Sequence, residues 1–539
     1  MTVLPDILRR RATEQPEGTA YIFLGEDGEE KTSITFAGLD ARARSVAAEL
    51  SRHCEPGDRA LLIFPQSLDF IVAYFACLYA QVVAVPVNPP RRTRIQDATR
   101  SIIADCEPAV VLTVSGMAAL GSTVESAHRI AVDEVPGGDF APVPCTAETL
   151  AFLQYTSGST AEPKGVMVSH GNLMANEEMI RRAFGHDERS TVVGWAPFFH
   201  DQGLIGNVLQ PLYAGATAIL MTPAAFIRRP LSWLTTISRY RAHTSGGPNF
   251  AFDACVAAAA RGVPELDLSS WRVAFNGAEP IRAETLRRFA DTFGPYGFDE
   301  KAMYPCYGLA EATLIVSGSG KGRGPRTIEA DVTELRRGRL VEAAGGRTIA
   351  GSGVVLPGED VRIVDPATHE PCAEGEIGEI RVAGDHVTQG YWKRPEAAEF
   401  TGSHLRTGDL GALLDGELYV VGRLKDLIII RGRNFYPQDI EHTAQQAHPA
   451  LRPGGCAAFS VPGAAGEKLV VVAEIRREYR HEADTPALAG TIRAAVLREH
   501  EVSAGDVLLA RVNQLSRTSS GKIRRAAARK RYLESGFDV

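Results

Sequence analysis

Residues 155–165 read Tyr155-Thr156-Ser157-Gly158-Ser159-Thr160-Ala161-Glu162-Pro163-Lys164-Gly165, between apolar runs at 150–153 and 166–168. This pattern predicts a strand, a polar loop and a second strand. Glycine lets a backbone approach an anion closely, hydroxyl and N–H groups donate to phosphate oxygens, and lysine adds a positive charge. The composition favours a loop that holds a triphosphate, with a serine- and threonine-rich surface hairpin as the alternative.

The loop does not fit a Walker A motif, in which Gly-Lys-Ser/Thr opens a helix, because Lys164 lies between Pro163 and Gly165 and an apolar run follows. The pattern Thr-Ser-Gly-Ser-Thr-x-x-Pro-Lys-Gly instead resembles the phosphate loop of the adenylate-forming superfamily. That superfamily includes acyl-CoA synthetases, fatty acyl-AMP ligases and nonribosomal adenylation domains. The resemblance implies that the nucleotide phosphates are held by Thr156, Ser157, Gly158, Ser159, Thr160 and Lys164, with Thr160 also near a magnesium ion.

Composition places the chain among soluble globular proteins. It has 539 residues, 45% hydrophobic and 23% charged, with a formal net charge of −7. The slightly acidic balance argues against nucleic acid as the main partner. The eight cysteines are scattered without a C-x-x-C pair, which favours a reducing, cytoplasmic location and no structural zinc.

Neither the N-terminus nor the longest apolar run predicts membrane insertion. The first residues lack a basic segment followed by an apolar core, so we expect no signal peptide. The run from Phe70 to Val87 is interrupted by polar residues and proline, and is better interpreted as a helix followed by a buried strand.

The order of the elements predicts an α/β protein. Short apolar runs at 59–64, 82–87 and 109–114 alternate with helical patterns at 41–50 and 94–106, which is typical of doubly wound parallel sheets. Strand-like segments at 361–365, 376–382 and 417–421 predict a small β subdomain that closes a large domain over residues 1–422. The remainder, 423–539, predicts a small, mobile α+β domain.

Two segments resemble the part of the family that contacts the carboxylic acid. His200 and Asp201 follow two aromatic residues and precede a glycine-rich turn; the resemblance puts His200 beside the substrate carboxylate, although an isolated histidine is often a core residue bonded to its neighbour. Gln202 stands where methionine is common in fatty acyl-AMP ligases. Acyl-pocket candidates are Trp195, His200, Gly246, Gly247, Pro248 and Phe252.

Further motifs resemble the nucleotide-binding parts of the family in the same order. Asn276, Gly277, Ala278 and Glu279 would line one face of adenine, and Tyr307 would stack on the base beside the turn at Gly308. Glu311 would bind Mg²⁺, which accepts one carboxylate together with substrate phosphates. Asp409, expected in a turn, would hold the ribose hydroxyls, and Arg423 would reach ribose or phosphate.

The C-terminal motifs imply a moving domain. Lys425 matches the hinge position, residues 432–437 match a loop that lines the thiol tunnel in relatives, and Lys522 matches the mobile catalytic lysine. The interval at 318–353 is rich in glycine and arginine. It resembles an insertion of the fatty acyl-AMP ligases that holds the small domain in place and obstructs the domain orientation that uses CoA. This interval favours the fatty acyl-AMP ligase branch.

The implied reaction uses ATP and Mg²⁺. A fatty acid carboxylate attacks the α-phosphorus to give acyl-AMP and pyrophosphate, and the acyl group then passes to the phosphopantetheine thiol of an acyl carrier protein. Eight basic residues between Arg511 and Arg531 could attract such an acidic partner. The alternatives are a fatty acyl-CoA ligase and a catalytically silent relative that binds nucleotide or acyl groups.

Overall fold

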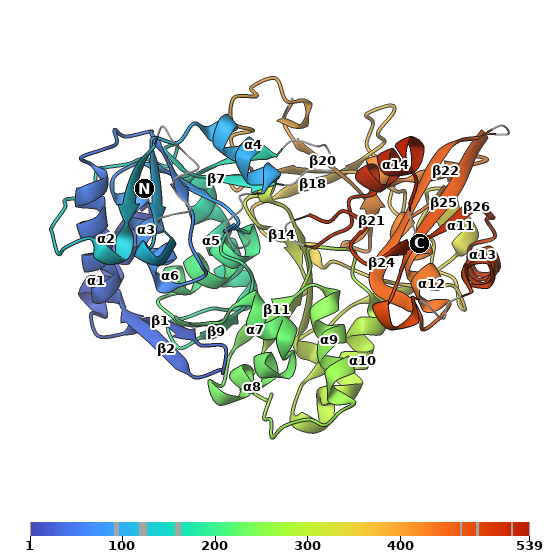
Figure 1. Ribbon diagram of the computed structural model, residues 1–539, viewed down its shortest axis with the longest axis horizontal. Coiled ribbons are helices and arrows are strands. Elements are labelled where there is room, and N and C mark those ends of the chain that lie inside the picture. The colour runs from blue at the N-terminus through green and yellow to red at the C-terminus, as the bar shows by residue number, and fades with distance from the viewer. Residues whose placement is uncertain are drawn as a thin grey trace.

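The structure is a computed structural model that describes residues 2–90, 96–117, 127–156, 163–400, 402–463, 466–480, 484–518 and 521–537. A large α/β part holds the N-terminal four-fifths of the chain, and a smaller part containing α12, α13 and α14 holds the C-terminus (Figure 1). The helices of the large part are α1 (Leu4–Glu14), α2 (Phe36–Leu50), α3 (Leu68–Tyr79), α4 (Asp97–Cys106), α5 (His170–Phe184), α6 (Gln210–Ala214), α7 (Pro223–Arg228), α8 (Leu231–Arg239), α9 (Asn249–Ala259), α10 (Ala283–Phe293) and α11 (Val332–Arg336).

The first sheet has the strand order β6-β5-β3-β4-β7-β8. Its strands are β3 (Arg59–Leu62), β4 (Val83–Pro86), β5 (Val110–Thr113), β6 (His128–Ala131), β7 (Leu150–Thr156) and β8 (Lys164–Ser169). All neighbours are parallel except β7 and β8, which form an antiparallel hairpin in which Thr156 pairs with Lys164. The two predicted strands are confirmed.

The second sheet runs β18-β19-β20-β21-β17-β14-β13-β12-β11-β9-β10-β1-β2. Its centre is parallel from β1 to β13, and the strands from β14 to β18 are antiparallel. The parallel group is β1 (Thr19–Leu24), β9 (Thr191–Gly194), β10 (Thr217–Leu220), β11 (Thr244–Gly247), β12 (Val273–Asn276) and β13 (Met303–Gly308). The remaining strands are β2 (Glu30–Thr35), β14 (Ile315–Gly318), β17 (Val354–Val355), β18 (Asp360–Val364), β19 (Gly378–Ala383), β20 (Leu405–Leu414) and β21 (Glu417–Arg423).

The most apolar part of the sequence, residues 70–87, lies in the core. Every residue of α3 except Asp69 is buried, and β4 follows it, so the predicted helix and buried strand are both present. None of the helices in the described part of the chain is long and apolar enough to span a membrane.

The C-terminal part is an α+β unit. Its sheet joins β24 (Leu451–Gly463), β25 (Gly466–Ile475) and β26 (Ala504–Arg511), in that order. Around this sheet lie α12 (Pro437–Gln446), α13 (Thr485–His500) and α14 (Arg525–Glu534), with a hairpin of β22 (Ile428–Ile430) and β23 (Arg433–Phe435) leading in. Residues 433–435 are therefore a strand rather than part of a loop, because they pair with β22.

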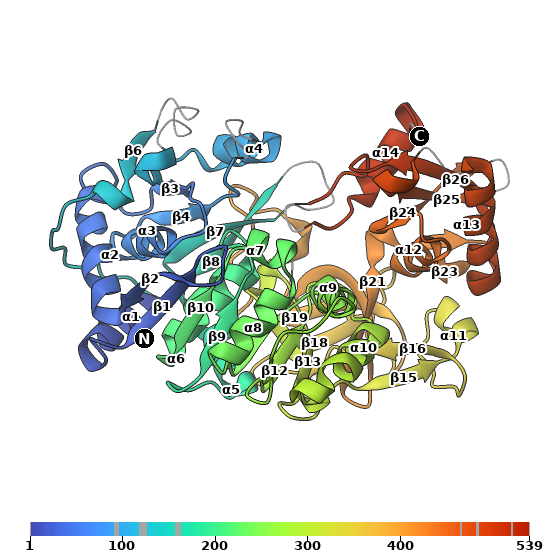
Figure 2. The same ribbon diagram turned by 60° about the horizontal axis from the view of Figure 1, so that its bottom comes forward.

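The interval 318–353 is folded. It contains the antiparallel hairpin of β15 (Thr327–Ala330) and β16 (Arg347–Ala350), with α11 between the two strands. Figure 2 shows these elements beside α12 and α13 of the C-terminal part. Arg336 donates to Glu501 Oε2 at 2.5 Å and to the His500 carbonyl at 2.9 Å, and Arg347 forms a bidentate pair with Asp439.

Candidate active site

Lys522 faces the large part of the molecule from the C-terminal unit. Its loop is closed by hydrogen bonds from Thr518 N to Lys522 O, at 2.8 Å, and from Lys522 N to Thr518 Oγ1, at 3.1 Å. The residue is exposed to solvent. Desolvation by the surrounding protein lowers the pKa of Lys522, repulsion from Arg423 lowers it further, and the carboxylates of Asp201, Glu279 and Asp409 oppose that shift. The fold therefore brings this lysine close to three acidic residues that lie more than a hundred residues away along the chain.

His200 and Asp201 form an adjacent pair. His200 Nδ1 lies 2.5 Å from Asp201 Oδ1, which also accepts from Gln202 N at 2.6 Å. Burial raises the pKa of Asp201, but attraction to His200, hydrogen bonds and Lys522 outweigh burial, and the net pKa is lowered. His200 does bond to its neighbour, yet its side chain is 27% exposed and is not a core group.

The predicted glycine-rich turn after this pair is wrong. Residues Gln202–Leu209 form a π-helix, η3, which Asp201 caps. Helices of this type are rare in proteins, and those that occur are often found at functional sites. A Cβ at Gly203 would overlap the Pro197 carbonyl oxygen. Glycine is therefore required here for close packing rather than for a turn.

The acyl-pocket candidates gather at the ends of β9 and β11. A Cβ at Gly247 would lie 2.6 Å from Cζ2 of Trp195, so the indole packs directly on this glycine. At Gly246, a Cβ would overlap the Phe275 carbonyl oxygen. Pro248 is the N-cap of α9, whereas the ring of Phe252 is fully buried among Trp233, Trp271 and Phe289. Phe252 is thus a core aromatic residue on the inner side of the proposed pocket wall.

The adenine-binding candidates follow β12. Asn276 is buried, donates to the Gly247 carbonyl at 3.2 Å, and has an Oδ1 without a hydrogen-bond partner among the described residues. Its side chain thus joins the adenine candidates to the acyl candidates. Ala278 adopts φ +69°, a left-handed conformation that is uncommon for a non-glycine residue and clusters at functional sites.

Asp409 lies in strand β20, not in a turn, and pairs in register with Arg423 on β21. The strand continues because β20 hydrogen-bonds on both sides, to β19 and β21. Tyr307 donates its hydroxyl to Asp409 Oδ2 at 2.8 Å, and Arg423 Nε lies 3.0 Å from Oδ1. Burial raises the pKa of Tyr307, and the Asp409 charge raises it further. Both oxygens of the proposed ribose carboxylate are already engaged.

Gly308 tolerates no side chain, because a Cβ there would overlap the Leu314 carbonyl oxygen. We expect Gly308→Ala to lower the free energy of unfolding by about 1–3 kcal/mol, the range typical of overpacking. Chemical denaturation measures the change. Gly294→Ala is the matched control, since a Cβ at Gly294 meets nothing within 4 Å, and it should stay within about 0.5 kcal/mol of the parent. Equal stability of the two variants would contradict the prediction.

Glu311 accepts a hydrogen bond from the Tyr391 hydroxyl at 2.8 Å, and burial raises its pKa. Thr388 fixes the backbone by donating twice, through N and Oγ1, to the Glu311 carbonyl. Among the described residues no three His, Cys, Asp or Glu side chains could hold a metal by themselves. A single carboxylate fits Mg²⁺ that brings phosphate ligands with it, so Glu311 suits a metal that enters with the nucleotide.

The phosphate loop itself is only partly visible. Ser157, Gly158, Ser159 and Thr160 lie outside the described residues, and so does the proposed magnesium contact of Thr160. Thr156 and Lys164 form the ends of the surrounding strands. Lys164 Nζ lies 2.5 Å from Glu399 Oε1 and 4.5 Å from the centre of the Tyr391 ring. Sequence reasoning missed Tyr391 and Glu399, because no local pattern places them beside a loop more than two hundred residues earlier.

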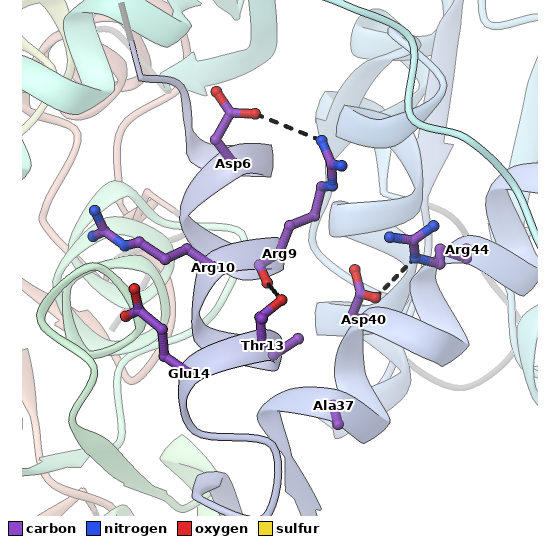
Figure 3. Close-up of a pocket in the computed structure, with 9 residues that line it drawn as sticks. Asp6, Arg9, Arg10, Thr13, Glu14, Ala37, Asp40 and Arg44 are labelled. Carbon is purple, nitrogen blue, oxygen red and sulfur yellow. Dashed lines mark hydrogen bonds and ion pairs between the residues drawn. The ribbon is translucent and has the colours of Figure 1, made fainter.

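A separate surface hollow of about 480 Å³ lies between α1 and α2, on the opposite side of the molecule from α14 (Figures 1 and 3). Four of its charged residues form two pairs: Arg9 with Asp6 at 3.9 Å and Arg44 with Asp40 at 2.8 Å. Nothing in this hollow adds to the site described above.

Two family models together match most of the chain. Residues 8–392 match the AMP-binding enzyme family, and residues 425–539 match the AMP domain of the Disco-interacting protein 2-like family. The chain belongs to the AMP-binding enzymes and, among them, to the fatty acyl-AMP ligases.

Individual relatives cover nearly all of the chain. The medium-chain-fatty-acid–[acyl-carrier-protein] ligase JamA of Moorena producens (strain JHB) is 41% identical over 100% of this chain and 96% of its own length. A structure from a study of fatty acyl-adenylate ligases of E. coli and L. pneumophila has a TM-score of 0.90 at 35% identity, covering 99% of this chain and 98% of the other. The L. pneumophila fatty acyl-adenylate ligase in complex with acyl adenylate and pyrophosphate has a TM-score of 0.76 at 38% identity, covering 99% and 96%.

Proposed function

We propose that the chain activates a fatty acid with ATP to acyl-adenylate and pyrophosphate, and then transfers the acyl group to the phosphopantetheine thiol of an acyl carrier protein. The observation that carries this proposal is the position of Lys522 within electrostatic reach of Asp201, Glu279 and Asp409. Family membership and the carrier-protein ligase JamA among the relatives support it. All eight cysteines are free thiols, which supports a cytoplasmic location.

In the first half-reaction, the carboxylate oxygen of the fatty acid forms a bond to the α-phosphorus and the bond to pyrophosphate breaks. Charge develops on the phosphate oxygens, so positioning and cations supply most of the rate. Lys522 bridges the substrate carboxylate and the α-phosphate, and His200 orients that carboxylate. Lys164 holds the leaving pyrophosphate, and Glu311 would hold a Mg²⁺ ion, whose positive charge would offset the negative charge of the phosphates.

The nucleoside occupies the ends of β12 and β13 and the middle of β20. Tyr307 and residues 276–279 enclose adenine, Asp409 accepts from the ribose hydroxyls, and Arg423 lies beside Asp409 for ribose or phosphate. The unpartnered, buried Oδ1 of Asn276 supports a ligand here, because buried acceptors normally have a donor.

The second half-reaction requires the small domain to turn. We place the domain boundary between residues 422 and 423 and the hinge at Lys425, in the short 3-10 turn η8 (Leu424–Asp426) that joins β21 to β22. Hinges are usually such element-terminal positions. The second family match starts at residue 425, which supports this division. Burial and repulsion from Arg423 lower the pKa of Lys425, so the hinge lysine is held in an environment that disfavours its charge.

The proposal is tested by fatty-acid-dependent release of pyrophosphate, followed by mass measurement of the carrier protein with its acyl group. Release without a fatty acid requirement, or no release at all, would refute it and favour the silent relative. A series of acids of increasing chain length in the same assay identifies the preferred substrate.

The insertion at 318–353 favours a carrier protein over free CoA as acceptor. Its Arg336 and Arg347 pair with Glu501 and Asp439 of the small domain, and its Leu335 packs in one apolar cluster with Tyr436. These contacts oppose rotation of the small domain away from its orientation in this structure. We therefore expect little acyl-CoA when ATP, fatty acid and CoA are supplied together.

Weakening the contacts of Arg336 and Arg347 with the small domain should raise the use of CoA. Each arginine pair contributes up to about 1 kcal/mol, so Arg336→Ala with Arg347→Ala should raise acyl-CoA formation by up to about thirtyfold. The measurement is acyl-CoA by mass. Arg337→Ala is the matched control, because among the described residues Arg337, the C-cap of α11, forms its ion pair with Glu334 of that helix and none with the small domain. Abundant acyl-CoA from the parent enzyme would instead support a CoA ligase.

A further inference from the structure

The ion pair between Lys164 and Glu399 joins the phosphate loop to a segment 235 residues away. Lys164 Nζ lies 2.5 Å from Glu399 Oε1, and the two side chains are 23% and 35% exposed. The same ammonium lies 4.5 Å from the centre of the Tyr391 ring, whose hydroxyl donates to Glu311. The proposed phosphate-binding lysine and the proposed metal carboxylate therefore share one aromatic neighbour.

Backbone hydrogen bonds fix the position of this pair. Residues 389–400 run along β8: Met167 N donates to the Gly390 carbonyl at 2.9 Å, and Trp392 N donates to the Gly165 carbonyl at 2.7 Å. The segment then forms the 3-10 turn η7 (Ala398–Phe400), which carries Glu399. The ring of Phe400 packs edge-on against Tyr391, with 5.1 Å between ring centres. Glu399 is thus held against the end of the phosphate hairpin.

Because it is negatively charged, Glu399 competes with other anions for Lys164. Burial raises its pKa, but the hydrogen bond and the charge of Lys164, with Lys425 nearby, outweigh burial and lower the net pKa. Glu399 is consequently ionised at neutral pH and neutralises Lys164. A half-exposed pair of this kind contributes little to stability, so its main consequence is electrostatic.

We propose that Glu399 is the resident counter-ion of Lys164, which the β- and γ-phosphates of a nucleotide displace, and that it thereby lowers the affinity of the site for polyphosphates, the pyrophosphate product included. This inference rests on the proposed binding of ATP. A triphosphate supplies several negative charges and takes the lysine from a single carboxylate, whereas a monophosphate places none at this position. After pyrophosphate leaves, Glu399 recaptures Lys164, which favours product release.

The test compares binding of three probes by calorimetry: α,β-methylene-ATP with Mg²⁺, which cannot form an adenylate, inorganic pyrophosphate and AMP. Glu399→Gln removes the charge and keeps the size of the side chain. We expect it to bind α,β-methylene-ATP and pyrophosphate about two- to tenfold more tightly than the parent, as expected for loss of one competing ion pair. Binding of AMP should not change.

Two further variants isolate the pair. Glu396→Gln removes an exposed charge from the same segment and should bind all three probes as the parent does. In a Lys164→Ala background, Glu399→Gln should lose its effect, because the two residues are coupled only through their contact.

Three results would overturn the inference. Unchanged or weaker binding of α,β-methylene-ATP by Glu399→Gln would show that Glu399 does not compete with the ligand. An equal gain for AMP would point to a general effect of charge. If the parent protein bound none of the probes, the proposed ATP site itself would be refuted. That outcome differs from equal binding by the parent and the variant, which would refute only the role of Glu399.

Discussion

Lys522→Ala should reduce fatty-acid-dependent release of pyrophosphate by about a hundred- to a thousandfold, the usual cost of losing one preorganised charge that stabilises the transition state. The side chain reaches into the site from the small domain and is exposed to solvent, so its removal should leave the fold intact. Affinity for ATP should change little, because the other proposed nucleotide contacts come from the large domain.

The same variant separates the two half-reactions. When acyl-adenylate is supplied ready-made, Lys522→Ala should still transfer the acyl group to the carrier protein, because the lysine acts in adenylate formation only. Lys530→Ala is the matched control: it removes a lysine from α14 of the same domain, where Lys530 lies 3.8 Å from Glu534. Parent-like pyrophosphate release by Lys522→Ala would disprove the assignment of the catalytic lysine.

Asp409→Asn should raise the dissociation constants of both ATP and AMP about ten- to a hundredfold. Hydrogen bonds to a charged group are worth about 1.5–3 kcal/mol. The substitution also removes the carboxylate partner of Arg423, whose Nε lies 3.0 Å from Asp409 Oδ1 in the parent protein. Binding of pyrophosphate, which has no ribose, should change much less. Calorimetry with the three ligands therefore tests the ribose role directly.

Asp415→Asn provides the comparison for this substitution. Asp415 follows the end of β20 in the same hairpin and pairs with Arg326 at 2.7 Å, with its side chain 67% exposed. It should bind all three ligands like the parent. If Asp409→Asn affected pyrophosphate as strongly as AMP, the carboxylate would be organising the whole site through Arg423 rather than holding the ribose.

Local pattern was sufficient for the elements of the fold. Alternating apolar segments predicted β3, β4 and β5 with the helices between them, and the polar stretch at 155–165 predicted the hairpin of β7 and β8. These predictions succeed because burial and backbone preference are written in neighbouring residues. The prediction for Asp409 failed for the same reason: β20 is a strand because it pairs with β19 and β21, and that pairing is not visible in the residues around Asp409.

The order of the motifs also let the sequence, by itself, determine the class of enzyme and name Lys522, Glu311 and Asp409 as candidates. Only the tertiary structure decided their partners. Glu399 on Lys164 and Glu501 on Arg336 are contacts between segments at least 165 residues apart. Such contacts depend on how whole domains pack, and a periodic or compositional signal carries no information about them.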